Sequence, residues 1–365
     1  MAGIPIIDSH IHLYPEAEMP TLAWLKPDHP LASEHSVTEY ASAAGSCKSL
    51  KGYILVETDR KQHLTEEGWK YPLVEVAWMS RVATGNALEE EDFTPEDAKK
   101  CLAIIPWAPV PSGPEALEKY LAKVEEAAGD AWGKVKGFRY LLQDKPGGTM
   151  LTEEFVGGIK YLGKRGFIFE VGVDQHRRGK KQLDELVELI SRAHEDVPDE
   201  EKVTFIISKF LRTHIPSHPP VPISRAPFEL TLLDHMCKPD LTIYNLSDKG
   251  FTNWRTAIYT LSRCEKTFIQ LSGGFSEMTD SLKNQSPDEI FEAIFPWFGI
   301  LLATIGAEKL IFGSDWPIST VGVEGNAWEK WHGVVNRMCY MASLTEEKQK
   351  LLYAENAIKA FNLDV

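Results

Sequence analysis

The sequence has few cysteines, and their pattern excludes two kinds of protein. It contains five (Cys47, Cys101, Cys237, Cys264 and Cys339), which is an odd number, and no two of them form a C-x-x-C pair. A small secreted domain held by disulfides needs an even, dense set of cysteines, and a thiolate zinc site needs close pairs. The cysteine usage therefore indicates a reducing compartment.

Long apolar runs are also missing. No stretch reaches the roughly 18–20 consecutive apolar residues that a membrane-spanning helix requires. The first residues, MAGIPIIDSHIHLYP, contain neither a basic segment nor a long apolar one, so they lack the pattern of a cleaved secretion signal. We therefore expect a soluble, cytoplasmic protein that has no membrane partner.

Basic residues are outnumbered by acidic ones. The 39 lysines and arginines stand against 53 aspartates and glutamates, which gives a formal net charge of −14. Nucleic acids and anionic membranes bind to basic surfaces, so neither is expected as a partner. A small molecule is the expected partner, and a homo-oligomer stays open. The chain also lacks a G-x-G-x-x-G motif after its first predicted strand, which argues against a doubly wound dinucleotide-binding sheet.

Short β-rich apolar runs alternate with longer amphipathic stretches along the whole chain. Strands separated by helices indicate parallel βαβ units. Residues 1–365 are therefore predicted to form a single-domain α/β protein, a (β/α)₈ barrel of the TIM type. The amphipathic stretches include Glu115–Glu126, Lys181–Ala193 and Pro287–Ile305. The nine candidate strands are Ile4–Leu13, Gly52–Glu57, Cys101–Trp107, Val135–Leu142, Phe167–Val173, Val203–Ile207, Phe228–Asp234, Thr267–Ser272 and Leu310–Ser314.

The prediction gives nine strands, one more than an eightfold barrel needs. The additional strand falls between residues 203 and 234. Two strand-like runs there flank a segment rich in proline and histidine, RTHIPSHPPVPISRAP, where a helix is expected. We therefore predict an inserted segment near residues 208–233. Its two ends, Ser208–Phe210 and Glu229–Asp234, can be encoded by splice-donor and splice-acceptor sequences. We hypothesise that the segment is a translated intron, or at least dispensable, and that it impairs activity; the genomic sequence tests this.

His10 and His12 lie two residues apart at the end of the first predicted strand. The period of two in a strand points both side chains to one face, here the barrel interior at its C-terminal mouth. Two imidazoles there can bind a metal or donate hydrogen bonds to a substrate carbonyl. Asp8 shares their parity and is expected to point the same way. The alternative is a pair of core histidines bonded to the backbone.

Two further candidates for the mouth are Asp315 and His235. Asp315 follows the last predicted strand in Leu-Ile-Phe-Gly-Ser-Asp-Trp-Pro, where the catalytic residues of this fold lie, although many aspartates at strand ends only cap turns. The first and last strands adjoin in a closed barrel, so Asp315 is expected beside the two histidines. His235 lies near the end of the sixth strand region, and an exposed loop histidine is the alternative.

Other polar residues at strand ends are candidates for substrate contacts. Arg139 ends the fourth predicted strand and suits an oxyanion or a polarised carbonyl, although a surface salt bridge is an equal alternative. Glu57 and Arg60 belong to a polar cluster after the second strand that suits hydroxyl groups. His176 follows the fifth predicted strand and is a candidate for the mouth, although a residue of a solvated loop is the favoured alternative. Trp316 follows Asp315, where an aromatic ring can stack on a sugar, although most tryptophans serve packing alone.

Several motifs resemble the sugar-lactonase branch of the amidohydrolase-related family. They occur in the family's order and span nearly the whole chain. The stretch from Leu22 to Tyr40 is most similar to fungal L-rhamnono-γ-lactonases. The motifs are Asp8-Ser-His-Ile-His12, Lys136-Gly-Phe-Arg-Tyr-Leu-Leu-Gln143, Asp234-His-Met-Cys-Lys-Pro239, Leu271-Ser-Gly-Gly274, Gly313-Ser-Asp-Trp-Pro317 and Ala354-Glu-Asn-Ala-Ile358.

The resemblance implies a hydrolase that opens a sugar γ-lactone, such as L-rhamnono-1,4-lactone, to the aldonic acid in rhamnose catabolism. Asp315 is then the general base. His10, His12, His235 and Arg139 polarise the carbonyl and hold the oxyanion. The cofactor is either none or one divalent cation, Zn²⁺, with His10, His12 and Asp315 as its ligands. A binuclear centre is not expected, because the fourth strand offers Arg139 in place of a lysine and the fifth has no histidine.

Two alternatives stay open. A zinc-dependent decarboxylase of aromatic or unsaturated carboxylic acids uses the same set of histidines and aspartate on the same barrel. A non-catalytic barrel scaffold is the other, although such a scaffold has no physical reason to keep His10, His12 and Asp315 together. Glu57 and the acidic balance favour a neutral polyhydroxy substrate over a dicarboxylate.

Overall fold

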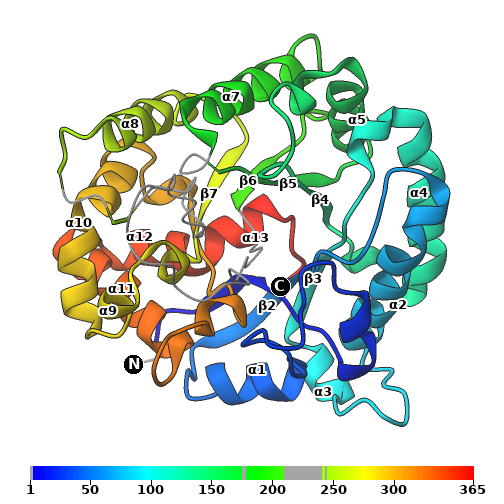
Figure 1. The fold of residues 1–365 in the computed structure, drawn as a ribbon, viewed down its shortest axis with the longest axis horizontal. Helices are drawn as coiled ribbons and strands as arrows, with labels where there is room; N and C mark the ends of the chain where they lie inside the picture. Colours follow the sequence, from blue (N-terminus) through cyan, green and yellow to red (C-terminus); the bar gives the residue numbers. More distant parts are fainter. Residues whose placement is uncertain (1–2, 175–177, 209–240, 243–244) are drawn as a thin grey trace, which may run out of the picture.

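The computed structural model describes residues 3–174, 178–208, 241–242 and 245–365. Eight parallel strands alternate with helices in this part of the chain, which confirms the predicted α/β fold (Figure 1). Eight of the nine predicted strands correspond to them. The strands are β1 (Ile6–Ile11), β2 (Leu50–Val56), β3 (Cys101–Ile105), β4 (Gly137–Leu141), β5 (Ile168–Gly172), β6 (Phe205–Ser208), β7 (Thr267–Leu271) and β8 (Leu310–Phe312).

Helices surround the strands in Figure 1. Most of them are amphipathic, and the apolar sides of these helices pack on the outward-facing residues of the strands to form the largest core cluster. The helices are α1 (Val37–Ala44), α2 (Lys70–Thr84), α3 (Pro95–Ala98), α4 (Gly113–Ala128), α5 (Glu153–Lys164), α7 (Lys180–His194), α8 (Lys249–Leu261), α9 (Asp280–Lys283), α10 (Pro287–Thr304), α11 (Ala327–Met341), α12 (Glu346–Lys350) and α13 (Asn356–Ala360).

The strands form two parallel sheets, β1-β2-β3 and β4-β5-β6-β7-β8. Short parallel bridges join the sheets at both seams. Trp107 pairs with Arg139 between β3 and β4, and Ile11 pairs with Trp316 between β1 and the segment after β8. The eight strands thus follow one another around a ring, as the (β/α)₈ prediction requires.

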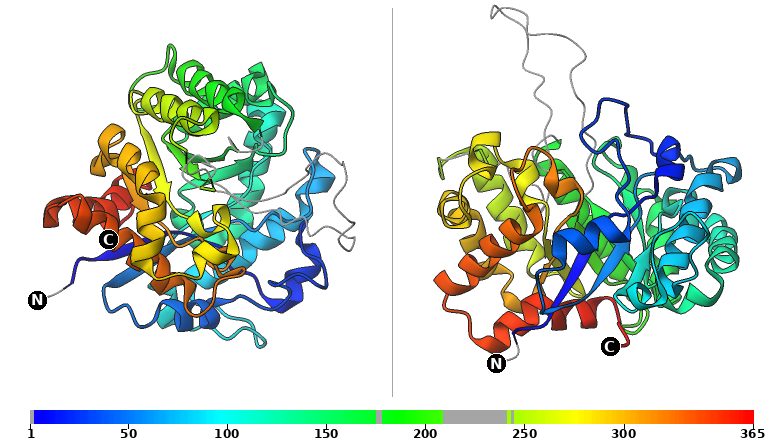
Figure 2. Two further views of the ribbon diagram at one scale, coloured as in Figure 1. Left: turned by 60° about the vertical axis from the view of Figure 1, so that its left-hand side comes forward. Right: turned by 90° about the horizontal axis from the view of Figure 1, so that it is seen from below.

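The barrel interior is apolar toward the amino ends of the strands. Inward-facing residues there form their own cluster, which includes Ile7, Ile54, Ile168, Ile206 and Ile311. Residues of α13 and the chain end pack against the same cluster, and α13 lies across the centre of Figure 1. The side view in Figure 2 shows the C-terminal segment at one end of the barrel. This end is therefore closed by hydrocarbon, which leaves the carboxyl ends of the strands for polar groups.

Some predictions fall outside the described residues. β6 ends at Ser208, and residues 209–240 are not described, so the ninth strand (Phe228–Asp234) and the insertion near 208–233 stay predictions. The four cysteines within the described residues are all free thiols, in agreement with the absence of a disulfide framework there. None of the helices within those ranges combines the length and the apolar character needed to cross a bilayer.

Candidate active site

A β-bulge in β1 determines where its polar side chains point. Asp8 pairs with Tyr53 of β2, and Ile11 pairs with Leu55, so three steps along β1 match two along β2. Such a bulge reverses the alternation of side chains. Asp8 therefore faces the helices, where the Tyr40 hydroxyl and the Trp328 indole donate to its Oδ2 at 2.9 and 2.8 Å. The expectation that Asp8 points into the mouth is wrong, because it assumed an unbroken period of two.

Beyond the bulge, His10 and His12 face the barrel interior, and both are fully buried. His12 Nδ1 lies 3.1 Å from the carbonyl oxygen of Val56. A carbonyl oxygen only accepts, so this nitrogen carries the proton and Nε2 presents its lone pair. Burial above all, and to a lesser degree the electrostatic interactions with His10 and Arg139, lower the pKa of His12 well below its ordinary value, so its imidazole is neutral.

Asp315 follows β8 in a left-handed backbone conformation, with φ of 59°. Short polar residues tolerate this conformation better than others do. Hydrogen bonds on both sides hold it in place. The Asp315 amide donates to the His10 carbonyl at 2.9 Å, and the Ser314 amide donates to Asp8 Oδ1 at 2.8 Å. The outward-facing Asp8 thus fixes the loop that carries Asp315 against β1.

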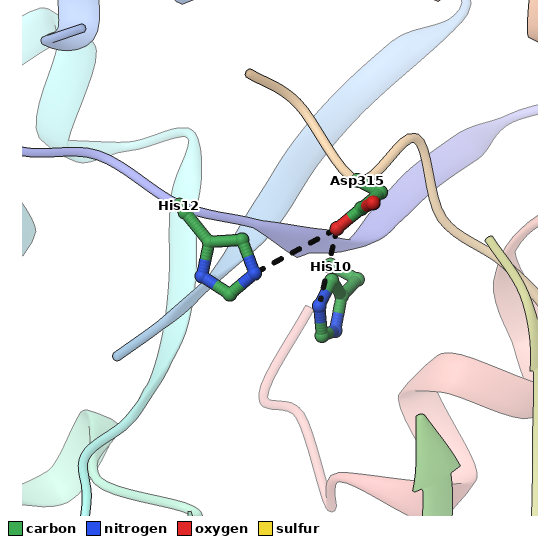
Figure 3. Close-up of side chains that lie close together, drawn as sticks. All are labelled: His10, His12 and Asp315. Atoms are coloured by element: carbon green, nitrogen blue, oxygen red, sulfur yellow. Dashed lines mark ion pairs between the residues drawn. The ribbon is translucent and has the colours of Figure 1, made fainter. Parts of the chain in front are cut away.

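The side chains of His10, His12 and Asp315 converge (Figure 3). Nε2 of His10 and Nε2 of His12 each lie 3.7 Å from Asp315 Oδ1. One ligand atom from each residue lies within 4.8 Å of the others, and all three residues are buried. Two strands that are far apart in sequence thus place two imidazoles and one carboxylate around a common point at the carboxyl end of the barrel.

Arg139 lies beside this centre between two buried carboxyl groups. Its Nη1 is 3.5 Å from Glu57 Oε1, and its Nε is 3.4 Å from Glu170 Oε1. Glu170, on β5, also lies 3.2 Å from His10 Nδ1 and accepts a hydrogen bond from Ser208 of β6 at 2.6 Å. Glu170 therefore connects the arginine with the first of the two histidines.

The two carboxyl groups differ in ionisation. Burial raises the pKa of Glu57 to about 8, although Arg139 attracts its charged form. Burial also raises the pKa of Glu170, but His10, Arg139 and the Ser208 hydroxyl outweigh it and bring the pKa below its ordinary value. At neutral pH Glu170 is therefore the charged partner of Arg139, and Glu57 carries a proton. Separated pKa values of neighbouring carboxyl groups are typical of catalytic sites.

Glu170 and Ser208 were not predicted as site residues. Glu170 lies in the run Phe-Glu-Val-Gly-Val of β5, where the prediction concerned only the absence of a histidine. A single charged residue in an otherwise apolar, buried strand was the available signal. Gln270 of β7 is a further interior polar residue; its amide donates to the Ser9 carbonyl at 3.1 Å.

The structure places two predicted substrate contacts against protein groups. Arg60 pairs with Glu18 at 2.9 Å and with Glu75 at 3.1 Å, which ties the segment after β1 to the segment after β2. The ring of Trp316 lies 5.6 Å from the ring of Tyr40 and is 4% exposed. Their roles toward a substrate stay predictions. His235 and His176 lie outside the described residues, and so do their predicted roles.

The donor set of the centre fits one divalent cation. The proton on His12 Nδ1 leaves the lone pair of Nε2 facing a carboxylate oxygen. The contact of His10 Nδ1 with the Glu170 carboxylate at 3.2 Å favours the proton on Nδ1 and the same orientation for His10. Two acceptor nitrogens and a carboxylate around one point repel each other unless a cation or a proton lies between them. Imidazole nitrogen and carboxylate oxygen are ligands of zinc, and carboxylates that orient the ligating histidines are typical of zinc sites.

The barrel carries His10 in β1, His12 directly after it and Asp315 after β8, and comparisons with known proteins indicate the class of protein to which this arrangement belongs. Residues 230–363 match the family model described as amidohydrolase. The match begins within the last residues of the predicted insertion. In fold, the chain resembles a zinc-bound amidohydrolase from Burkholderia multivorans, with a TM-score of 0.66, 19% identity and coverage of 99% of this chain and 100% of the other. The predicted relationship to amidohydrolases, and with it the enzyme class, is confirmed.

Two curated relatives are more specific. The chain is 29% identical to an L-rhamnono-γ-lactonase from Scheffersomyces stipitis, and the alignment covers 100% of both chains. It is 23% identical to an L-fucono-1,5-lactonase from Burkholderia multivorans over 61% of this chain and 60% of the relative. The predicted similarity to L-rhamnono-γ-lactonases is therefore confirmed over the whole sequence.

Proposed function

We propose that this protein hydrolyses the lactone of a deoxy sugar acid, such as L-rhamnono-1,4-lactone, to the open aldonic acid. The observation that carries the proposal is the convergence of His10 Nε2, His12 Nε2 and Asp315 Oδ1 in one buried centre. Opening a lactone needs a base for water and a positive charge near the carbonyl oxygen; Asp315 offers the base, and Arg139 beside the centre offers the charge. The full-length similarity to a rhamnonolactonase supports the choice of substrate.

Asp315 begins the reaction as the general base. Its carboxylate takes a proton from a water molecule, and the water oxygen bonds to the lactone carbonyl carbon. The carbonyl oxygen becomes an oxyanion, which the positive charge of Arg139 stabilises. The bond from the carbonyl carbon to the ring oxygen then breaks. The proton on Asp315 passes to the departing ring oxygen, which becomes the hydroxyl group of the acid.

The residues His10, His12 and Asp315 would hold one divalent cation. When bound, such a cation supplies Lewis-acid polarisation of the carbonyl group. The contribution of the chain is to present the three ligand atoms from β1 and from the loop after β8. Glu170 orients His10, and the Val56 carbonyl orients His12.

A panel of aldonolactones with a pH indicator tests the proposal. Each opened lactone releases one acid, so the indicator reports turnover directly. We expect L-rhamnono-1,4-lactone, or a close deoxy-sugar lactone, to open faster than it does spontaneously. Acid release from none of the aldonolactones, together with CO₂ release from a hydroxybenzoate, would show the alternative decarboxylase.

A further inference from the structure

A small apolar cluster lies at the carboxyl end of the barrel, apart from the two larger core clusters. We call it the mouth cluster. Its members come from the segment after β1, from the end of β4 and from the segment after β8. Its buried residues are Tyr14, Leu22, Trp24, Leu31 and Ile318, and the partly buried residues packed against them are Met19, Leu25, Leu141 and Val321.

The mouth cluster lies directly beyond the polar centre along the chain. Tyr14 is two residues after His12. Leu141 is two residues after Arg139 in β4, so both side chains share a face of that strand. Its neighbours Tyr140 and Leu142 pack in the outer core, whereas Leu141 packs in the mouth cluster, which confirms the inward direction.

The segment after β8 also connects the mouth cluster with the polar centre, because Ile318 is three residues after Asp315. The Ser319 amide donates to the Asp315 carbonyl at 2.9 Å, so this turn is closed on itself. The barrel interior thus has three layers: hydrocarbon near the amino ends of the strands, the polar centre, and hydrocarbon again at the mouth.

The mouth cluster presents an apolar surface, because its polar groups are bonded within the protein. The Tyr14 hydroxyl donates to the Leu31 carbonyl at 2.9 Å, and the Trp24 indole donates to the Thr58 carbonyl at 2.8 Å, so both polar groups are engaged within the protein. Leu141 and Val321 are aliphatic and only partly buried. At Leu141 the paired residue of β5 is Gly172, which adds no side chain to this face.

We propose that the mouth cluster, through Leu141 and Val321, determines specificity by binding the terminal methyl group of a 6-deoxy aldonolactone. The inference rests on the proposed function. With the lactone carbonyl at Asp315 and the histidines, the far end of the six-carbon chain extends toward the next layer of the barrel. A methyl group gains from contact with hydrocarbon, whereas a hydroxyl group at the same carbon loses its water and meets aliphatic side chains.

Two lactones that differ at one atom test this directly. L-Rhamnono-1,4-lactone and L-mannono-1,4-lactone differ only by a hydroxyl group on the terminal carbon. An apolar pocket discriminates against an added hydroxyl group by up to about 10²-fold, so we expect kcat/KM for the deoxy lactone to be roughly 10–100-fold higher. Leu141→Asn should lower this ratio about 10-fold. Val321→Thr, which keeps the shape, should lower it by a smaller factor.

Leu302→Asn is the matched control. Leu302 is also a partly buried leucine, but it lies on α10, outside the barrel. Leu302→Asn should leave the ratio of the two kcat/KM values as it is in the unchanged protein. The comparison therefore separates an effect on specificity from a general loss of stability.

The outcomes are distinguishable. If no aldonolactone is opened, the proposed function fails. If both lactones are opened equally well, or if Leu141→Asn and Val321→Thr keep the original ratio while folded, the role of the mouth cluster is refuted and the lactonase stands.

Discussion

His10 Nδ1 lies 3.2 Å from Glu170 Oε1, and both side chains are fully buried. This contact joins β1 to β5 across the barrel interior. It favours the proton on Nδ1 of His10 and leaves Nε2 to face Asp315, just as the Val56 carbonyl does for His12. A carboxylate and a carbonyl group therefore orient the two imidazoles of the centre.

Glu170→Gln keeps the size of the side chain and removes its charge. We expect the affinity for a divalent cation, and kcat/KM for the lactone, to fall about 10–100-fold, because outer carboxylates of this kind contribute that much to histidine metal sites. A competing chromophoric chelator measures the affinity. Glu75→Gln is the matched control, since Glu75 is also buried but pairs with Arg60. Equal losses of cation affinity in the two variants would mean that Glu170 is only structural.

Asp315→Asn removes the base and keeps the shape. Turnover of the lactone should fall roughly 10²–10⁴-fold while the protein stays folded. Steady-state kinetics measure the turnover, and circular dichroism checks that the variant is folded. Near-normal turnover in a folded Asp315→Asn variant would assign the base to another residue.

Glu57 predicts a pH dependence of stability. Its pKa is raised by burial from 4.5 to about 8 in the folded chain. The folded state thus binds this proton more tightly than the unfolded state does. The resulting gain in the free energy of unfolding is complete below about pH 4.5 and is lost as the pH rises through about 8. Glu57→Gln is neutral throughout, so the free energy of unfolding should fall less between about pH 5 and about pH 9 than in the unchanged protein.

Urea unfolding at several pH values measures this difference. Glu153→Gln, a change at an exposed residue on α5, is the control and should keep the original profile. If Glu57→Gln shows the same loss as the unchanged protein, the buried carboxyl is not the source of the pH dependence.

The ligand set predicts at most one cation in this centre. After dialysis against a chelator, titration with Zn²⁺ should show one tight site per chain, and His12→Ala should abolish it because one of the three ligands is lost. Mass spectrometry of the bound metal gives the stoichiometry. If the unchanged protein and the His12→Ala variant both retained two equivalents of Zn²⁺ per chain, this ligand assignment would be refuted.

The sequence predicted the parts of the fold and site that depend on local patterns. The alternation of strands and helices predicted the barrel, and the placement of His10, His12 and Asp315 at strand ends predicted that they lie together. Asp8 was placed wrongly because a bulge depends on pairing with β2, which the sequence of β1 alone does not reveal. Glu170 was missed because its partners His10 and Arg139 are remote in sequence.

Arg60 shows a similar limit. Its polar neighbourhood after β2 indicated a substrate contact, but the structure pairs it with Glu18 and Glu75, which are 42 and 15 residues away along the chain. Whether a charged residue finds a protein partner or a substrate is decided by packing between segments, and no local pattern encodes it.

Hydrolysis of L-rhamnono-1,4-lactone in ¹⁸O-labelled water, followed by mass spectrometry of the product, tests the central claim most directly. Water activated by Asp315 attacks the carbonyl carbon, so the account predicts one labelled oxygen in the carboxylate and none in the new hydroxyl group. The labelled acid should form much faster with the unchanged protein than with Asp315→Asn. Label in the hydroxyl group, or equal rates of product formation with and without the protein, would contradict the account.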